Sequence, residues 1–189
     1  DRLIRMEYDP TGIFEDRASQ SIFYRDMPAS AYSVFRADGV LTIRTDALLL
    51  TYQEGKAFSE DSLSIQLLSE PASKWRFGEH FETLGGTCKT LDEADGARPI
   101  EDGLCSRWGY SVLDDSKTLL LDETGWVAVR RDDTKDVYFF GYGYDYRGCI
   151  RDFYRITGAP TMLPAYALGN WWSRYHAYTQ EEYLSLMDR

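Results

Sequence analysis

Two pairs of adjacent carboxylates, Asp114-Asp115 and Asp132-Asp133, are the first residues to consider for chemistry. Two acids at one site can serve as general acid and general base. Neighbouring side chains on a β-strand, however, point to opposite faces, so adjacent acids do not converge on one substrate atom. Aspartate is also favoured in turns. We therefore interpret both pairs as structural.

The histidines and cysteines do not form the pattern of a metal site. The two histidines, His80 and His176, lie at no ligand spacing from a second histidine or a cysteine. Cys88, Cys105 and Cys149 are an odd number without a C-x-x-C spacing. A Cys88–Cys105 disulfide is conceivable, but we favour buried free thiols. This cysteine usage indicates a reducing compartment, and we expect no metal.

Composition and charge exclude several classes of protein. The 189 residues include 31 acidic and 21 basic side chains, for a net charge of −10, and 43% of them are hydrophobic. These values are typical of a soluble globular protein. No basic stripe is present to bind nucleic acid, and apolar runs such as 47–50 fall far short of the ~20 residues of a membrane-spanning helix. With no signal peptide evident in a chain that begins at Asp1, we expect a cytoplasmic protein.

Most of the sequence predicts β-strands. Asp38-Gly39 between alternating apolar residues predicts a hairpin, and the alternation over 63–67 predicts a half-buried strand. Strands are expected at 31–36, 40–44, 47–52, 63–67, 110–113, 119–121, 126–130 and 137–140. Short strands at this spacing favour a β-sandwich over βαβ units. Residues 78–109 have little periodicity, and a loop of this length is either functional or wraps one end of the sandwich.

The periodicity becomes helical near residue 145. Apolar residues over 146–157 predict a helix with Asp145 as its N-cap and Gly158 just beyond its end. Residues 166–172 predict a short buried strand, after which Thr179 and Glu182 form a capping box for a second helix. The apolar side of that helix consists of Tyr183, Leu184 and Met187. A strand followed by a helix is typical of the opening unit of a larger α/β domain.

Four stretches combine into a more specific pattern: LPAYALGNWWSRYHAY at 163–178, DVYFFGYG at 136–143, DFYRITG at 152–158 and FGE at 77–79. Together they resemble glycoside hydrolase family 31, the α-glucosidase and α-xylosidase group. The segment GGTCKTLD at 85–92 occupies the place of that family's N-domain active-site loop. The resemblance covers about residues 75–189, whereas residues 1–74 agree only in being rich in predicted strands.

The resemblance implies a mainly β fold. It predicts a galactose-mutarotase-like β-sandwich over 1–144, a connecting helix and linker over 145–163, and the first βα unit of a truncated (β/α)8 barrel over 164–189. A complete barrel needs roughly 250 residues.

The implied activity is retaining, exo-acting hydrolysis of α-linked glycosides or oligosaccharides by two barrel aspartates about 5–5.5 Å apart. In the family both aspartates lie downstream of the stretch that 163–178 resembles. We therefore expect the nucleophile and the acid/base to lie beyond Arg189, the last residue of this sequence. No catalytic residue is assigned, and we expect the chain alone to be inactive. No organic cofactor is implied.

Three residues are candidates for sugar binding on the same resemblance. Tyr175 matches an aromatic residue that lines the subsite of the non-reducing sugar, and the neighbouring Arg174 could pair with a carboxylate. Asp92 lies in the N-domain loop, where an aspartate accepts hydrogen bonds from the sugar in the leaving-group subsite. The alternatives are that Tyr175 belongs to an aromatic barrel core and that Asp92 is a solvated turn residue. We expect Trp171 and Trp172 to be core residues.

Two other functions compete with the enzyme. The chain could be a stand-alone carbohydrate-binding module, or a β-sandwich with a purely structural or interaction role. Residues 163–189 favour the enzyme, because a finished module has no use for one strand–helix unit with an apolar aromatic side. Such a unit exposes hydrophobic surface when it is left without its domain, so we expect the isolated chain to self-associate.

Overall fold

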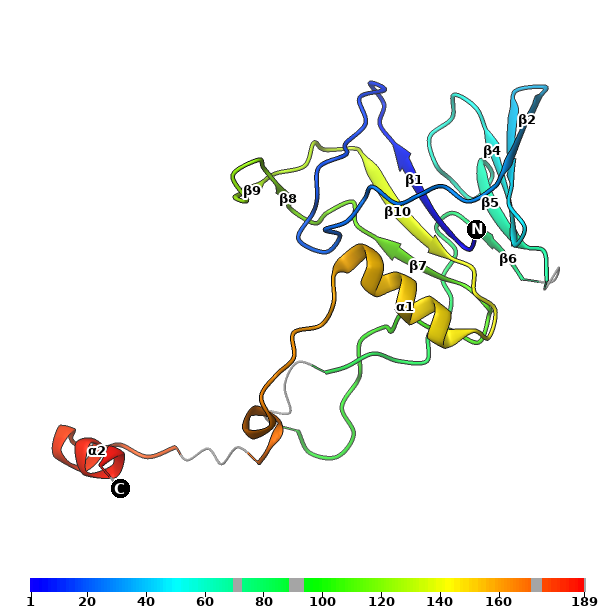
Figure 1. Cartoon of the computed structure of the whole chain (residues 1–189). Helices are drawn as coiled ribbons and strands as arrows, with labels where there is room; N and C mark the ends of the chain where they lie inside the picture. The colour runs from blue at the N-terminus through cyan, green and yellow to red at the C-terminus, as the bar shows by residue number, and fades with distance from the viewer. Residues whose placement is uncertain (70–72, 89–93, 171–174, 189) are drawn as a thin grey trace. The chain divides into compact units, whose positions relative to one another are not determined.

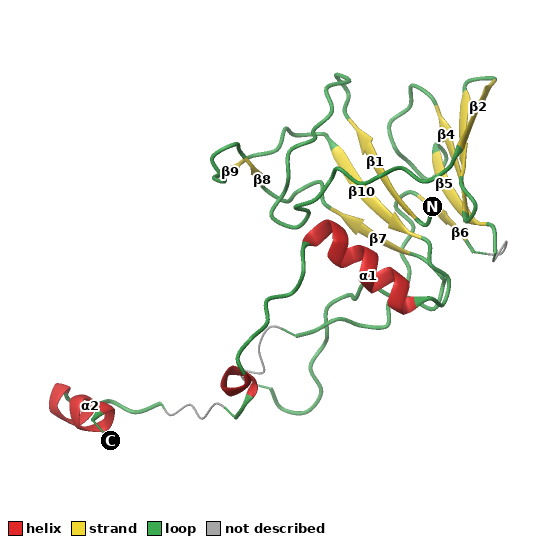
Figure 2. Ribbon diagram, viewed as in Figure 1, coloured by secondary structure: helices red, strands yellow, loops and turns green. Residues whose placement is uncertain are grey.

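A computed structural model describes residues 1–69, 73–88, 94–170 and 175–188 (Figure 1). The chain divides into two compact units, residues 1–159 and residues 160–189. The first unit is mainly β with antiparallel sheets and includes one α-helix, and the second contains a second α-helix (Figure 2). No helix among the described residues is long and apolar enough to cross a membrane.

A five-stranded antiparallel sheet is built from consecutive strands. Its order is β2 (Ser33–Ala37), β3 (Val40–Arg44), β4 (Leu48–Gln53), β5 (Leu63–Leu67) and β6 (Lys74–Arg76). The predicted hairpin joins β2 to β3, with Ala37 opposite Val40. Its two loop residues, Asp38 and Gly39, have φ angles of 52° and 75°. Two positive φ angles in a two-residue loop match the twist of the flanking strands, which is why this dipeptide predicts the hairpin correctly.

A three-stranded sheet joins the two ends of the first unit. Strand β10 (Lys135–Phe140) lies between β1 (Leu3–Tyr8) and β7 (Ser111–Asp114), and both pairings are antiparallel. A two-stranded ribbon, β8 (Leu120–Leu121) with β9 (Val127–Ala128), completes the strands. Strands β1 and β6 were not predicted. Strand β1 carries its charged residues on one face, an alternation that was overlooked, and β6 has only three residues.

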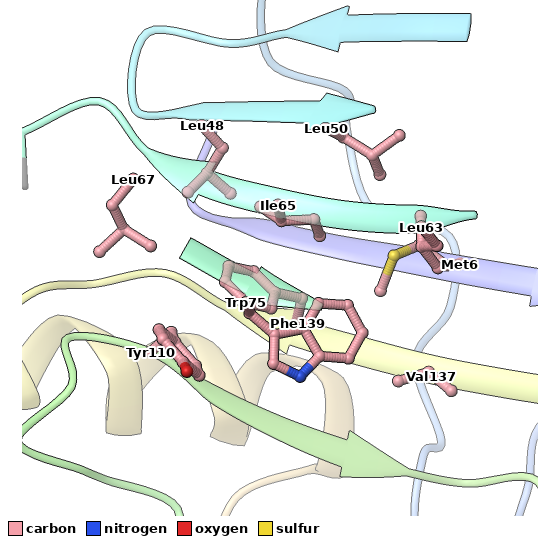
Figure 3. Close-up of a cluster of buried hydrophobic side chains, with 10 residues drawn as sticks. All are labelled: Met6, Leu48, Leu50, Leu63, Ile65, Leu67, Trp75, Tyr110, Val137 and Phe139. Carbon is pink, nitrogen blue, oxygen red and sulfur yellow. The ribbon is translucent and has the colours of Figure 1, made fainter. Parts of the chain in front are cut away.

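The main hydrophobic core lies between the two larger sheets. Side chains from both sheets point toward one another there (Figure 3). Phe139 of β10 stacks on Tyr110 with ring centroids 5.6 Å apart and contacts Trp75 of β6 at 5.5 Å. The buried members are Met6, Leu48, Leu50, Leu63, Ile65, Leu67, Trp75, Tyr110, Val137 and Phe139. This core agrees with the predicted fold at the level of a mainly β unit with packed antiparallel sheets.

The opposite face of β10 packs against helix α1 (Tyr146–Thr157). Alternate side chains of a strand point to opposite faces, so Tyr138 and Phe140 leave the main core and pack with Cys149 and Ile156 of the helix. The predicted cap is confirmed, because the Asp145 carboxylate accepts a hydrogen bond from the Gly148 N–H at 3.0 Å. The helix ends at Thr157, and Gly158 lies just beyond its end, as predicted, with a φ of 95°.

One predicted element of the second unit, the strand over 166–172, is wrong. Residues 165–168 form a 3-10 helix, where a strand was predicted over 166–172; Trp171 and Trp172 lie outside the described residues. A strand needs a neighbour to pair its backbone groups, whereas the 3-10 turn uses local bonds such as Gly169 N–H to Tyr166 O at 3.2 Å. Among the described residues no barrel strand is present. Helix α2 (Gln180–Met187) begins with the predicted capping box.

Candidate functional site

The sequence predicts that a loop of the first unit binds a sugar, and two hydrogen-bonded segments form the base of that loop. Thr83 and Ser106 form an isolated antiparallel bridge. Leu84 N–H donates to the Cys105 carbonyl at 2.8 Å, and Gly86 N–H donates to the Glu101 carbonyl at 2.7 Å. We call the two segments 83–87 and 101–106 the loop neck. The long excursion between residues 87 and 101 therefore starts from a hydrogen-bonded pair of segments rather than from an irregular coil.

Glycines allow the two sides of the neck to approach this closely. A Cβ atom on Gly103 would lie 2.3 Å from the Gly85 carbonyl oxygen, and one on Gly86 would lie 2.7 Å from the Asp102 carbonyl oxygen. Both contacts are with backbone, which cannot swing aside. The Thr83 hydroxyl also bridges the two sides, because it accepts from Gly85 N–H at 3.2 Å and from Gly103 N–H at 3.0 Å. The Gly-Gly pair of the sequence thus has a packing role.

Several of the predictions drawn from the family resemblance fall outside the described residues. Asp92 and Arg174, two of the three sugar-binding candidates, are among them. Arg189, beyond which the nucleophile and the acid/base were expected, also lies outside the described residues. The assignment of no catalytic residue within the chain therefore stays a prediction, as do the sugar contacts of Asp92 and Arg174.

Tyr175 is the one sugar-binding candidate that the structure describes. It belongs to the second unit, and its side chain is fully exposed. Its neighbours His176 and Tyr178 form an edge-to-face ring contact with centroids 4.5 Å apart. The exposed Tyr175 ring is available to a ligand, but the described residues bring no second candidate to it.

The Phe77-Gly78-Glu79 motif forms a tight turn after strand β6. Gly78 has a φ of 85°, and Glu79 N–H donates to the Arg76 carbonyl at 3.0 Å. The Glu79 carboxylate accepts from Arg76 N–H, also at 3.0 Å. Burial, and then the charge of Glu79, raise the pKa of the Tyr110 hydroxyl to about 12. The acid of the motif is therefore engaged in the turn, and its charge lies near a core tyrosine.

A buried ion cluster is the main feature that the sequence did not predict. It consists of Arg5, Arg25, Arg130, Asp115 and Asp136, and both carboxylates are almost fully buried. Arg25 contacts Asp115 at 2.9 Å and Asp136 at 2.8 Å, and Arg130 contacts the same two acids at 2.6 and 3.2 Å. The interpretation of Asp115 as a structural residue agrees with its position in this buried ion cluster. The sequence carries one signal of the cluster, Arg5, a cation on the polar side of an alternating strand.

Electrostatics inside the ion cluster keep Asp136 charged. Burial by itself raises the pKa of a carboxyl group, but the Arg5 hydrogen bond and the Arg5 and Arg25 charges outweigh it and hold the pKa of Asp136 below its usual value. The hydroxyl of Tyr138, whose pKa burial raises to about 12, lies near these charges. Because each acid is engaged by two or more arginines, the cluster fixes segments far apart in the sequence against β10 rather than transferring protons.

Comparison with known proteins assigns no family to the chain: no family model matches it, and no curated protein matches it significantly. The family resemblance therefore depends on its motifs. In the structure, 136–143 begins in strand β10 and 152–158 forms the end of α1 and its C-cap. In the part of the chain that the structure describes, no group of three metal-ligating side chains comes together.

Proposed function

We propose that this chain is the N-terminal portion of a retaining, exo-acting α-glycoside hydrolase similar to the family-31 α-glucosidases. The observation that carries the proposal is the set of family-like motifs, which occur in order along the chain. The structure supports it at one point: the motif expected in the last sandwich strand lies on β10, and the motif expected in the connecting helix lies on α1. The galactose-mutarotase-like topology and the barrel identity of residues 164–189 belong to this proposal.

The proposal gives the chain a binding role and leaves the chemistry to a barrel downstream of Arg189. Tyr175 stacks on the C–H face of the non-reducing sugar, which buries apolar area and leaves the hydroxyl groups free. Asp92, in the loop that the neck holds, accepts hydrogen bonds from two hydroxyl groups of the next sugar. Arg174 pairs with a nearby carboxylate. Bond cleavage is done by two aspartates of the barrel, one forming a glycosyl-enzyme intermediate and the other acting as acid and then base.

The first test is the intact mass of the native gene product from its source cells. We expect a mass larger than 21.8 kDa by at least a barrel of roughly 250 residues. That protein is then assayed with a panel of aryl α-glycosides, and we expect release of the aryl group with retention of the anomeric configuration. A product of 21.8 kDa that hydrolyses none of them contradicts the proposal. Sugar binding by calorimetry would then distinguish a carbohydrate-binding module from a structural domain.

The second test changes the proposed sugar contacts in the full-length enzyme. Loss of an aromatic stacking contact removes about 0.5–1.5 kcal/mol, so Tyr175→Ala is expected to raise KM about two- to tenfold. Tyr32→Ala is the matched control, because Tyr32 is also exposed and lies outside the motifs. Asp92→Asn is expected to affect substrates with a sugar leaving group more than aryl glycosides. Unchanged KM values for Tyr175→Ala would remove this residue from the site.

A further inference from the structure

Two cysteines that are far apart in the sequence meet in the first unit. Cys105 belongs to the loop neck and Cys149 to helix α1. Both line the same small cleft, together with Ser111 and Tyr142. Both also pack in the second hydrophobic cluster, where Cys149 is a buried member and Cys105 is half-buried at its margin. Cys88 is the cysteine closest to Cys105 in the sequence, whereas the fold places Cys149 beside Cys105.

The two thiols differ in their readiness to react. Burial, followed by the interaction with the Cys105 thiol, raises the pKa of Cys149 to about 12. The Ser111 hydroxyl hydrogen-bonds to the Cys149 sulfur and opposes that shift in part. Because the thiolate is the nucleophile in disulfide exchange, Cys149 does not attack first at neutral pH. Cys105 is the more exposed of the two and is the thiol that a small oxidant reaches.

We propose that Cys105 and Cys149 are a redox pair that forms a disulfide and ties the loop neck to helix α1. The oxidant is a low-molecular-weight disulfide such as oxidised glutathione. The Cys105 thiolate attacks one sulfur of the oxidant, forms a mixed disulfide and releases one glutathione thiolate, which takes up a proton. Cys149 then gives up its proton and attacks the Cys105 sulfur, which releases the second glutathione. Two protein thiols lose two electrons in total, and one oxidant molecule becomes two thiols.

The disulfide acts on the loop neck through chain entropy. It closes a long segment of the chain and so restricts the unfolded state more than the folded one. We expect the oxidised protein to have a Tm about 5–10 °C above that of the reduced protein. Amide hydrogen exchange is expected to slow at Leu84 and Gly86, whose N–H groups pair across the neck. This inference does not depend on the proposed function, because it concerns residues of the first unit alone.

The test is oxidation of the full chain followed by peptide mapping. Trypsin places the three cysteines on separate peptides, 77–89, 90–107 and 148–151, because the Arg98-Pro99 bond resists cleavage. After incubation with oxidised glutathione and alkylation of the remaining thiols, we expect one cross-linked species that joins 90–107 to 148–151. Free thiols, titrated under denaturing conditions, are expected to fall from three to one.

Two variants and the wild-type protein separate the possible outcomes. Cys88→Ser is the matched control and is expected to keep both the cross-link and the rise in Tm. Cys105→Ser is expected to lose both. Comparison of oxidised with reduced wild-type protein needs no variant to fold. A stable glutathione adduct on Cys105, a cross-link to peptide 77–89, or an unchanged Tm after cross-linking would each overturn the proposal.

Discussion

The two units of the chain use the same local signals to start a helix but differ in what they bury. Helix α1 begins at the N-cap Asp145 and buries Cys149 and Ile156. Helix α2 begins with a complete capping box at Thr179 and Glu182, yet none of its residues is buried. A helix of eight residues is marginal in water without packing. A cap therefore determines where a helix begins, and burial determines how much the rest of the molecule depends on it.

The polar interactions of the two units differ in the same way. In the first unit, the ion cluster holds carboxylates that are almost fully buried. In the second, the bonds between Thr179 and Glu182 are exposed, and the backbone and side-chain hydrogen bonds of Thr179 hold the pKa of Glu182 below its usual value. Water can replace a lost partner only at an exposed site. Substitutions in the two units should therefore have effects of different size.

The largest effect is expected from Arg25→Met in the ion cluster. Loss of this cation leaves Asp115 and Asp136 buried with less compensation, which is expected to lower the free energy of unfolding by about 3–5 kcal/mol. The control is Arg36→Met, because Arg36 contacts Glu54 at a similar distance, 2.9 Å, but on the surface. We expect that control to cost less than about 1 kcal/mol. Urea unfolding at pH 7 measures both, and equal losses would contradict the comparison.

The pH dependence of stability gives a second test of the Arg25→Met variant. The pKa of Asp136 is lower in the folded protein than its usual value, so its stabilising contribution is present above the unfolded pKa of ~3.9 and is lost as the pH falls below it. The Arg25 charge is one cause of that lowering. In Arg25→Met, the folded and unfolded pKa values of Asp136 move closer together. Between pH 5 and pH 2, the variant should therefore lose less additional stability than the wild-type protein.

A smaller effect is expected when the two helix caps are removed. Asp145→Ala leaves the Gly148 N–H without its acceptor and should lower the free energy of unfolding by about 1 kcal/mol, because α1 unfolds with the core. Thr179→Ala removes the corresponding bond to Glu182 N–H. We expect it to speed local amide exchange in α2 without changing the urea midpoint of the first unit. A shift of that midpoint by Thr179→Ala would show that α2 unfolds cooperatively with the core.

Local signals predicted the elements that local interactions define. The Asp38-Gly39 hairpin, the bounds of strand β5 (Leu63–Leu67) and both helix N-caps could be found from neighbouring residues. Strand β1 was missed although Arg5 and Glu7 alternate with apolar residues, as in the predicted strand 63–67. In the fold, Arg5 contacts Asp136, which is 131 positions away. Strand β6 has three residues and depends on its pairing with β5. The strand predicted at 166–172 had the apolar pattern of a buried strand, but its described part includes the 3-10 helix Ala165–Leu168, which uses local hydrogen bonds.

The candidate site was less accessible to sequence reasoning than the fold. Asp92, Arg174 and Tyr175 come from motifs, and a motif carries no information on whether residues of two loops converge. The cysteines show the same limit. Cys88 and Cys105 are close in sequence and so form the obvious pair, whereas Cys149 reaches Cys105 only because α1 packs across β10. Pairings of this kind depend on the packing of whole elements and cannot be found by spacing.

The smallest effect on stability is expected from replacing exposed apolar side chains of the second unit. None of the described residues after Ala159 is buried, and Met162, Tyr166, Leu168 and Met187 are each more than two-thirds exposed. Changing these four to serine in the full chain should alter the free energy of unfolding of the first unit by less than about 0.5 kcal/mol. It should nevertheless abolish self-association, because an exposed apolar surface of this kind favours contact between molecules.

Light scattering as a function of concentration measures that change. The matched control is Trp126→Ser with Val129→Ser, which removes side chains of similar exposure from the first unit. If the control dissociates the protein and the fourfold variant does not, the exposed surface that matters lies in the first unit. A wild-type chain that is monomeric at all concentrations would remove the expectation of self-association altogether. The expected result, association lost with stability unchanged, would show that these four side chains contribute surface to the molecule but no core.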